Sequence, residues 1–187
     1  ISINPDFAEA HNNLGVTLQE LGQHDDAVKC FEKALAIKSN YVDVHCSLGI
    51  SLQELGQHDD AVKYFEQALA IQPDFADAHY NLGNALQDLD QLDEAVKSFE
   101  KALAINPDFA EAHNNLGITL KELDQLDDAV KSYEKAIAIK SDFAEAHNNL
   151  GNAFKDLGQL GAAVKSYEKT LTIKPDYAEV YNNLGFT

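Results

Sequence analysis

Apolar residues recur along the chain with the spacing of amphipathic helices. From residue 110 to 123, apolar or small residues stand mostly three or four positions apart, at Ala110, Ala112, Leu116, Gly117, Leu120 and Leu123. This spacing gives a helix one buried face. After a short turn, a second helix is predicted from Asp127 to about Ile139, with an inner face of Ala129, Val130, Tyr133, Ala136 and Ile137. The two helices are predicted to form an antiparallel hairpin.

The same pattern recurs with a period of 34 residues. The sequence F-A-E-A-H-N-N-L-G at 7–15 is repeated letter for letter at 109–117 and 143–151, and variants begin at 41, 75 and 177. A fixed period of this length predicts one supersecondary unit stacked on copies of itself. We therefore predict an all-α solenoid of five complete repeats, at 8–41, 42–75, 76–109, 110–143 and 144–177. Residues 1–7 match the end of a preceding repeat and 178–187 the start of a sixth, so we expect a fragment of a longer chain.

Small residues at fixed places in each repeat predict close helix contacts. A glycine in the middle of each first helix costs up to about 1 kcal/mol relative to alanine, so a close contact must offset it. We expect an alanine of the second helix to face this glycine, and the following aromatic residue to fill space toward the next repeat. The glycines are Gly15, Gly49, Gly83, Gly117 and Gly151, the alanines Ala27, Ala61, Ala95, Ala129 and Ala163, and the aromatic residues Phe31, Phe65, Phe99, Tyr133 and Tyr167.

These positions resemble the tetratricopeptide repeat (TPR) family over the whole chain. The family's pattern is an aromatic residue, Leu-Gly, a turn glycine, alanine, an aromatic residue, alanine and proline. The fourth repeat matches it with His113, Leu116, Gly117, Asp124, Ala129, Tyr133, Ala136 and Ser141. Histidine thus replaces the first aromatic residue, and aspartate replaces the turn glycine. The resemblance implies an α–α superhelix whose first helices line a concave face that binds extended peptide.

The candidate peptide-binding residues lie on the first helices, on a stripe predicted to face away from the packing. Positions four, seven and eleven after the second residue of each repeat share this stripe. It carries the amides Asn13, Asn81, Asn84, Asn115, Asn149, Asn152 and Asn183, one row of carboxylates at Glu9, Asp77, Glu111 and Glu145, and another at Glu20, Asp88, Glu122 and Asp156. An amide can pair with a peptide backbone whatever the peptide's side chains. Such a ladder is similar to that in the superhelical region of O-linked N-acetylglucosamine transferases.

The composition restricts the kind of partner. The chain is 45% hydrophobic and contains 31 acidic and 14 basic residues, for a net charge of −17. This field repels nucleic acid, anionic headgroups and acidic peptides, and no apolar run approaches membrane-spanning length. A neutral or basic protein or peptide partner is therefore expected. Cys30 and Cys46 stand at non-equivalent places, which predicts free thiols and, as no secretory signal opens the chain, a cytoplasmic location.

Signals of catalysis are weak. The Ser-x-x-Lys motif at Ser98 and Lys101 simply recurs with the second helix and has no partner motif. Five of the seven histidines stand one repeat apart, which is too far for a shared zinc ion, so we expect them to pack. We predict a non-catalytic scaffold without a metal or cofactor. Two alternatives stay open: the substrate-selecting region of a larger enzyme such as a glycosyltransferase, and a structural spacer that self-associates end to end through exposed half-repeats.

Overall fold

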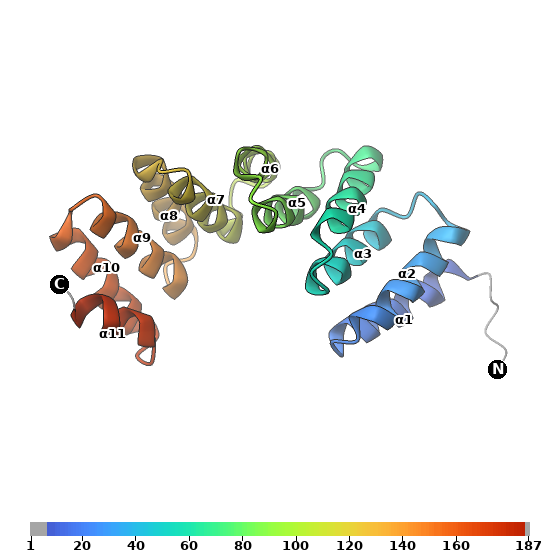
Figure 1. The fold of residues 1–187 in the computed structure, drawn as a ribbon, viewed down its shortest axis with the longest axis horizontal. Coiled ribbons are helices and arrows are strands. Elements are labelled where there is room, and N and C mark those ends of the chain that lie inside the picture. Colours follow the sequence, from blue (N-terminus) through green and yellow to red (C-terminus); the bar gives the residue numbers. More distant parts are fainter. Residues whose placement is uncertain (1–6, 186–187) are drawn as a thin grey trace. The chain divides into compact units, whose positions relative to one another are not determined.

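The computed structural model describes residues 7–185, and the predicted repeat fragment at 1–6 and the last two residues lie outside this range. Within it the chain forms eleven α-helices and no strand, so the prediction of an all-α fold is confirmed (Figure 1). The first helices are α1 (Ala8–Glu20), α3 (Val42–Glu54), α5 (Ala76–Asp88), α7 (Ala110–Glu122), α9 (Ala144–Asp156) and α11 (Ala178–Gly185). The second helices are α2 (His24–Ile37), α4 (His58–Ile71), α6 (Leu92–Ile105), α8 (Leu126–Ile139) and α10 (Leu160–Ile173).

The turn inside each hairpin ends the first helix with a left-handed residue. At the end of α1, Gly22 has a φ of 71°, its N–H donates to the Gln19 carbonyl, and the Gln23 N–H donates to the Leu18 carbonyl at 2.8 Å. These two bonds form the Schellman motif. Asp124 has a φ of 61° in the same place at the end of α7. Aspartate replaces the turn glycine there because its short polar side chain tolerates this conformation.

The mid-helix glycines make room for an aromatic ring of their own hairpin. A Cβ atom added at Gly15 would lie 2.6 Å from the Phe31 ring, and one at Gly117 would lie 2.6 Å from the Tyr133 ring. At Gly15, Gly49, Gly117 and Gly151 the nearest atoms thus belong to this ring and not to the alanine that we predicted, and the aromatic residue is not directed only toward the next repeat. Glycine is needed at these positions because the ring of the second helix lies closer than a Cβ atom allows.

The repeated histidines tie each first helix to the loop before it. His45, His79, His113 and His147 are 6–8% exposed. Their Nε2 atoms lie 2.8–3.1 Å from the carbonyl oxygens of residues 39, 73, 107 and 141 respectively. In the sixth repeat the Tyr181 hydroxyl donates to the Pro175 carbonyl at 2.9 Å. These side chains therefore have the packing role that we expected for them, with an added bond to the backbone.

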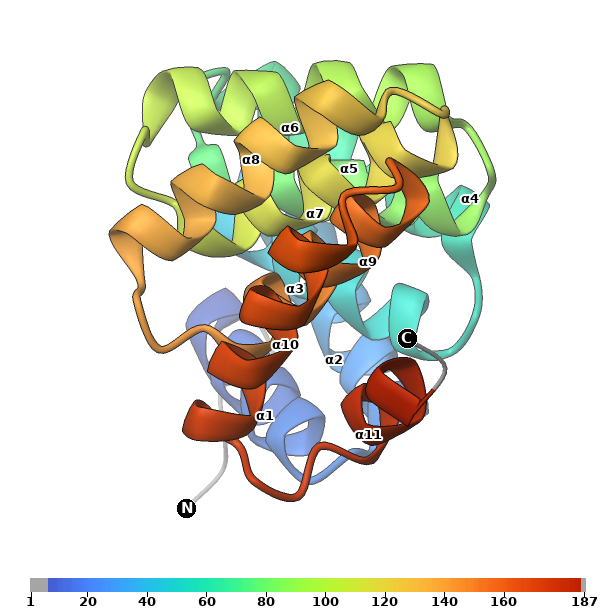
Figure 2. The same ribbon diagram turned by 90° about the vertical axis from the view of Figure 1, so that its left-hand side faces the viewer.

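The chain divides into two compact halves, residues 1–98 and 99–187, with the boundary inside α6. In the N-terminal half, the hairpins α1–α2 and α3–α4 pack in sequence, and α4 contacts α5. In the C-terminal half, the hairpins α7–α8 and α9–α10 pack in the same manner, and α10 leads through a loop into α11 (Figure 2). Tyr167 and Val180 are buried together where α10 meets α11. None of the helices found in residues 7–185 has the length and apolar character needed to cross a lipid bilayer.

Candidate functional site

In the C-terminal half, two successive first helices border a small pocket. Its volume is about 230 Å³, and it is lined by Ile118, Lys121, Glu122, Tyr133, Asn149 and Asn152. Glu122, Asn149 and Asn152 belong to the predicted peptide-binding stripe. The structure therefore brings stripe residues from α7 and α9 to one place, together with the Tyr133 side chain from α8.

The stripe amides form hydrogen bonds between successive repeats. Asn149 donates through Nδ2 to Asn114 Oδ1 at 3.0 Å, and Asn114 donates to Asn115 Oδ1 at 3.1 Å. Asn183 donates through Nδ2 to Asn152 Oδ1 at 3.1 Å. The prediction that this stripe faces away from the packing is therefore incorrect for these amides, which help to hold neighbouring first helices together.

These bonds fix the orientation of two amides at the pocket. Asn152 Oδ1 accepts hydrogen bonds from both the Tyr167 hydroxyl, at 2.8 Å, and Asn183. Two donors meet this oxygen, so the NH₂ group of Asn152 is the end available to another molecule. Asn149 uses an N–H to reach Asn114, so its carbonyl oxygen is the complementary end. The pocket thus presents one amide donor and one amide acceptor on the same face of α9.

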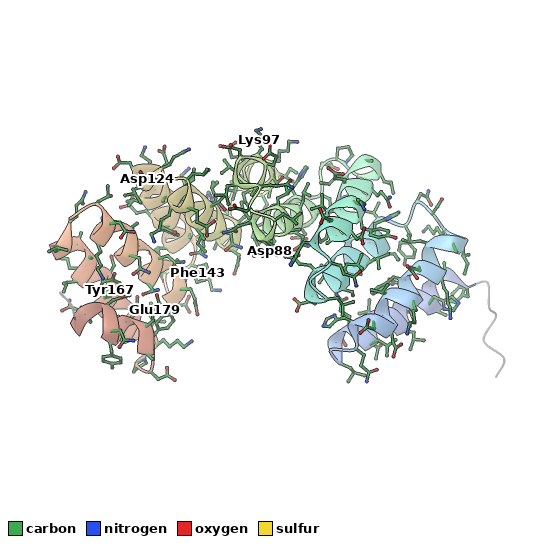
Figure 3. The ribbon with its side chains drawn as sticks, in the orientation of Figure 1. Asp88, Lys97, Asp124, Phe143, Tyr167 and Glu179 are labelled. Carbon is green, nitrogen blue, oxygen red and sulfur yellow. The ribbon has the colours of Figure 1, made fainter. Side chains whose placement is uncertain are left out.

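Lysines of the chain partly neutralise the carboxylate rows. Asp156 Oδ2 lies 3.2 Å from Lys121 Nζ across the first helices, and Glu111 Oε1 lies 3.2 Å from Lys140 Nζ. Such exposed ion pairs contribute only about 0–1 kcal/mol each. In the N-terminal half, Asp88 (labelled in Figure 3) instead accepts a hydrogen bond from Gln53 at 2.7 Å.

Two buried tyrosines next to the stripe were missed by the sequence analysis as site residues. Burial raises the pKa of Tyr167 to about 12, with Asp156 and Glu179 adding to the effect (Figure 3). Burial, with Glu122 and Asp156, also raises the pKa of Tyr133 far above its usual range. Both hydroxyls are therefore neutral donors at physiological pH. The signal in the sequence was the change from phenylalanine in the first three repeats to tyrosine in the last two.

The hydroxyls of these two tyrosines differ in their partners. Tyr167 donates to Asn152, whereas the equivalent place opposite Tyr133 holds Ile118, which cannot accept a hydrogen bond. Among residues 7–185, no hydrogen-bond acceptor is found for the Tyr133 hydroxyl, and this residue lines the pocket. Tyr133 is thus the polar group of the site that most needs an external partner.

The other predicted residues do not gather at this pocket. On α1, Glu9, Asn13 and Glu20 are exposed; on α5, Asp77 and Asp88 are exposed and Asn81 and Asn84 are half-buried; Glu145 is exposed on α9. Ser47 interrupts the amide row on α3. The N-terminal half therefore has fewer amides on this stripe than the C-terminal half.

The cysteines and histidines of the described region form no group of three or more metal-ligating side chains. Cys30 and Cys46 are buried free thiols. Burial, with Asp43 and Asp77, raises the pKa of Cys46 to about 12. Its thiol stays protonated at neutral pH and is a poor nucleophile.

Comparison with protein families agrees with the repeat geometry. Tetratricopeptide repeat profiles match residues 6–74, 76–109, 98–131, 119–158 and 151–187. The chain belongs to the tetratricopeptide repeat family. No curated protein sequence matches this TPR chain significantly.

Solved structures similar to this TPR protein share its fold over most of their length. The crystal structure of MamA is 28% identical, with a TM-score of 0.81, and the match covers 88% of this chain and 96% of MamA. MamA 41-end from Desulfovibrio magneticus RS-1 is 21% identical, with a TM-score of 0.84 and coverages of 95% and 99%. YrrB, described as a TPR protein with an unusual peptide-binding site, is 22% identical, with a TM-score of 0.80 and coverages of 97% and 94%. The predicted TPR solenoid class is therefore confirmed.

Proposed function

We propose that this TPR protein is a non-catalytic scaffold that binds an extended, neutral or basic segment of a partner protein along the first-helix stripe of its C-terminal half. The observation that supports this proposal is the pocket lined by Ile118, Lys121, Glu122, Tyr133, Asn149 and Asn152, in which Lys121 is paired with Asp156. It combines an apolar surface with a small number of oriented polar groups, which is typical of ligand sites.

The oriented amides match a peptide backbone. Asn152 offers an N–H donor and Asn149 offers a carbonyl acceptor, so one residue of an extended peptide can satisfy both, because its own C=O and N–H point to the same side. The Tyr133 hydroxyl supplies a further donor. Glu122 is exposed beside them and favours a lysine or arginine side chain in the ligand.

A binding titration with a matched variant tests this function. The probe is an acetylated, amidated peptide in which lysine alternates with alanine and serine, and the control peptide has glutamate in place of lysine. Tyr133→Phe removes one hydroxyl and installs the residue that earlier repeats already have, so the fold should be kept. We expect this variant to bind the lysine peptide about three- to tenfold more weakly in isothermal titration calorimetry, as for the loss of one hydrogen bond.

Asn13→Ala is the control for this titration, since Asn13 is exposed on α1 in the other half. It should leave the affinity unchanged. Equal binding of the two peptides, or equal affinity of wild type and Tyr133→Phe, would remove the first-helix pocket as the site.

A second candidate function, end-to-end self-association, is favoured by the exposed face of α1. Leu14 is 51% exposed, whereas the equivalent leucines Leu48, Leu82, Leu116 and Leu150 are at most 9% exposed. Leu21, at the C-cap of this helix, is 66% exposed. Inner repeats bury the leucine equivalent to Leu14, so a second copy could cover this face through a heterologous contact.

Sedimentation velocity over a range of concentrations tests self-association. Leu14→Lys should shift the protein toward monomer, while Leu160→Lys, at a leucine of similar exposure (52%) on α10, should not. A wild type that stays monomeric at high concentration would contradict this candidate. The enzyme alternative stays a prediction, which the complete reading frame will decide.

A further inference from the structure

The second helices of the C-terminal half form a groove that is repeated from one hairpin to the next. One pocket, of about 540 Å³, lies between the end of α6 and α8, with His113 and Leu116 of α7 at its base. Another, of about 390 Å³, lies between α8 and α10, with His147 and Leu150 of α9 at its base. Both volumes fall in the usual range of small-ligand sites. The two pockets share no residue with the first-helix pocket described above.

Seven lining positions of the first pocket recur in the second at a separation of 34, namely Glu100/Glu134, Leu103/Ile137, Ala104/Ala138, His113/His147, Leu116/Leu150, Ser132/Ser166 and Lys135/Lys169. Pro107, Asp108, Ala138 and Ile139 also line the first pocket, and Lys165 also lines the second. Each pocket thus has a histidine and a leucine at its base, a glutamate from one second helix and a lysine from the next. A feature repeated in this way belongs to the repeat itself.

In the N-terminal half, between α2 and α4, the side chain of Tyr64 lies over His45, and a pocket of about 320 Å³ remains beside it, lined by Val28, Glu32, Leu52, Gln57, Asp60, Lys63, Tyr64 and Gln67. The ring centroid of Tyr64 lies 6.0 Å from that of His45, with an angle of 32° between the rings. His45 corresponds to His113 and His147, and Tyr64 corresponds to Ser132 and Ser166. We call the place over His45, which holds Tyr64, the filled groove, and the places over His113 and His147, where serine leaves a pocket, the open grooves. Ser98 stands at the same position of the third repeat.

The surroundings of Tyr64 indicate how the ring is held. Tyr64 is half-buried, and its pKa is raised by burial and then by Glu32. Glu32 corresponds to Glu100 and Glu134, which line the two open pockets. A tyrosine that entered either pocket in the same manner would bring its hydroxyl close to a carboxylate, which can accept its hydrogen bond.

We propose that the open grooves over His113 and His147 bind tyrosine side chains of a partner protein, in the position that Tyr64 occupies over His45. The charged residues on the rims bear on the neighbouring residue of that partner. Lys135 and Lys169 stand where the filled groove has Gln67, and Lys63 also borders the filled groove. The groove over His147 is lined by Lys165 and Lys169 against Glu134, so a tyrosine beside an aspartate or glutamate is the complementary ligand there, because local charge outweighs the distant net charge at physiological ionic strength. The groove over His113 has Glu100 and Asp108 beside Lys135, so the ring alone defines its ligand.

Histidine ring resonances in an NMR titration test the proposal. The probe is acetyl-Asp-Tyr-Asp-amide and the control is acetyl-Asp-Ala-Asp-amide. The tyrosine peptide should shift the ring signals of His113 and His147 with millimolar affinity, as expected for one buried ring, and leave the His45 signals unchanged. The alanine peptide should shift none of them.

Variants copied from the filled groove locate the site. Ser132→Tyr installs the residue found over His45, so it should abolish the His113 response and leave that of His147, while Ser166→Tyr should do the reverse. Tyr64→Ser should create a response at His45. Lys169→Gln should weaken binding at His147 by about twofold to threefold, as for an exposed ion pair. Circular dichroism of each variant checks that the helices are kept.

Several outcomes would overturn the proposal. Equal shifts with the tyrosine and alanine peptides would show that the ring is not recognised. A His113 response that survives in Ser132→Tyr, or no response at either histidine, would exclude the groove. Shifts of these rings on concentrating the protein alone would instead identify a second copy of the chain as the occupant.

Discussion

The two halves of the chain have the same hairpin but different residues on its two exposed surfaces. Between second helices, Tyr64 lies over His45 in the N-terminal half, whereas Ser132 and Ser166 leave pockets over His113 and His147 in the C-terminal half. The third repeat has Ser98 at this position. On the first helices, Asn152 of the C-terminal half accepts a bond from Tyr167. The equivalent residues are Val16, Ile50 and Asn84 in the N-terminal half and Ile118 in the C-terminal half, so this position varies from repeat to repeat. The residues that recur every 34 positions thus determine the backbone. The binding surfaces differ at the few positions where the repeats have different residues.

The largest loss of stability is expected from substituting the mid-helix glycine, which has the same close ring contact in both halves. In Gly49→Ala and Gly117→Ala, the new Cβ atom would lie 2.6 Å from the rings of Phe65 and Tyr133 respectively. Overpacking of this kind costs about 1–3 kcal/mol, and each variant should lose a similar amount. Urea unfolding followed by circular dichroism measures the loss.

Gly161→Ala is the matched control for these two variants. Gly161 lies in α10 and a Cβ atom there would meet nothing within 4 Å. It should therefore stabilise the protein by up to about 1 kcal/mol through helix propensity alone. A large difference between Gly49→Ala and Gly117→Ala would contradict the view that the hairpin is the same in both halves.

The next largest effect on stability is expected from exchanging tyrosine and serine between the filled groove over His45 and the open groove over His113. Tyr64→Ser removes a half-buried ring and should lower the free energy of unfolding by about 1–2 kcal/mol. Ser132→Tyr adds a ring where there is a pocket, and should leave stability unchanged or raise it slightly. Thermal unfolding of the two variants and of the double variant measures these effects. A strongly destabilised Ser132→Tyr would mean that the two grooves are not equivalent.

Local spacing explains what the sequence was able to predict. The 34-residue period and the apolar stripes define helix positions, because they depend only on residues near one another in the chain. The same periodicity shows which face of a helix is buried, but it does not show which side chain lies opposite. For this reason an alanine was expected to face Gly117, whereas the ring of Tyr133 does so.

The candidate site was predictable only in part for the same reason. The stripe included Glu122, Asn149 and Asn152, which line one pocket. The bonds from Asn149 to Asn114 and from Asn183 to Asn152 depend on the distance between successive first helices, which the spacing along one helix does not give. The groove over His113 is open because residue 132 is a serine. The sequence alone does not show that a tyrosine at the equivalent position, Tyr64, lies over its histidine.

A smaller effect is expected from the histidines of the C-terminal half as the pH falls. Burial lowers the pKa of His113 and His147, so the folded protein binds fewer protons than the unfolded chain at mildly acidic pH. At a pH well above the ordinary histidine pKa of about 6.5, these histidines are neutral in both states and do not lower the free energy of unfolding. As the pH falls through that value toward the lowered pKa values, the unfolded chain takes up protons first, so the free energy of unfolding decreases.

Replacing both His113 and His147 with tyrosine isolates their contribution to the pH dependence of stability. In the sixth repeat, the Tyr181 hydroxyl already donates to the Pro175 carbonyl. The double variant His113→Tyr, His147→Tyr should therefore lose less stability than wild type between about pH 7.5 and 5.5, on either side of the histidine pKa. Urea unfolding at both pH values measures this. The same loss in both proteins would show that these two histidines do not contribute to the acid sensitivity.

The smallest effect distinguishes how the halves connect successive first helices. Lys121 and Asp156 form an ion pair at 3.2 Å in the C-terminal half, and Gln53 donates to Asp88 in the equivalent place of the N-terminal half. Lys121→Gln should convert the first contact into the second, with a loss of about 0.5 kcal/mol or less, because both groups are partly exposed.

A double-mutant cycle with Asp156→Asn isolates the coupling energy of the pair. This coupling should fall at high salt, where exposed charges are screened, whereas a cycle of Gln53→Ala and Asp88→Asn should change little with salt. If the coupling energies of both pairs had the same salt dependence, the lysine would add no charge-specific contact, and this difference between the halves would have no energetic consequence.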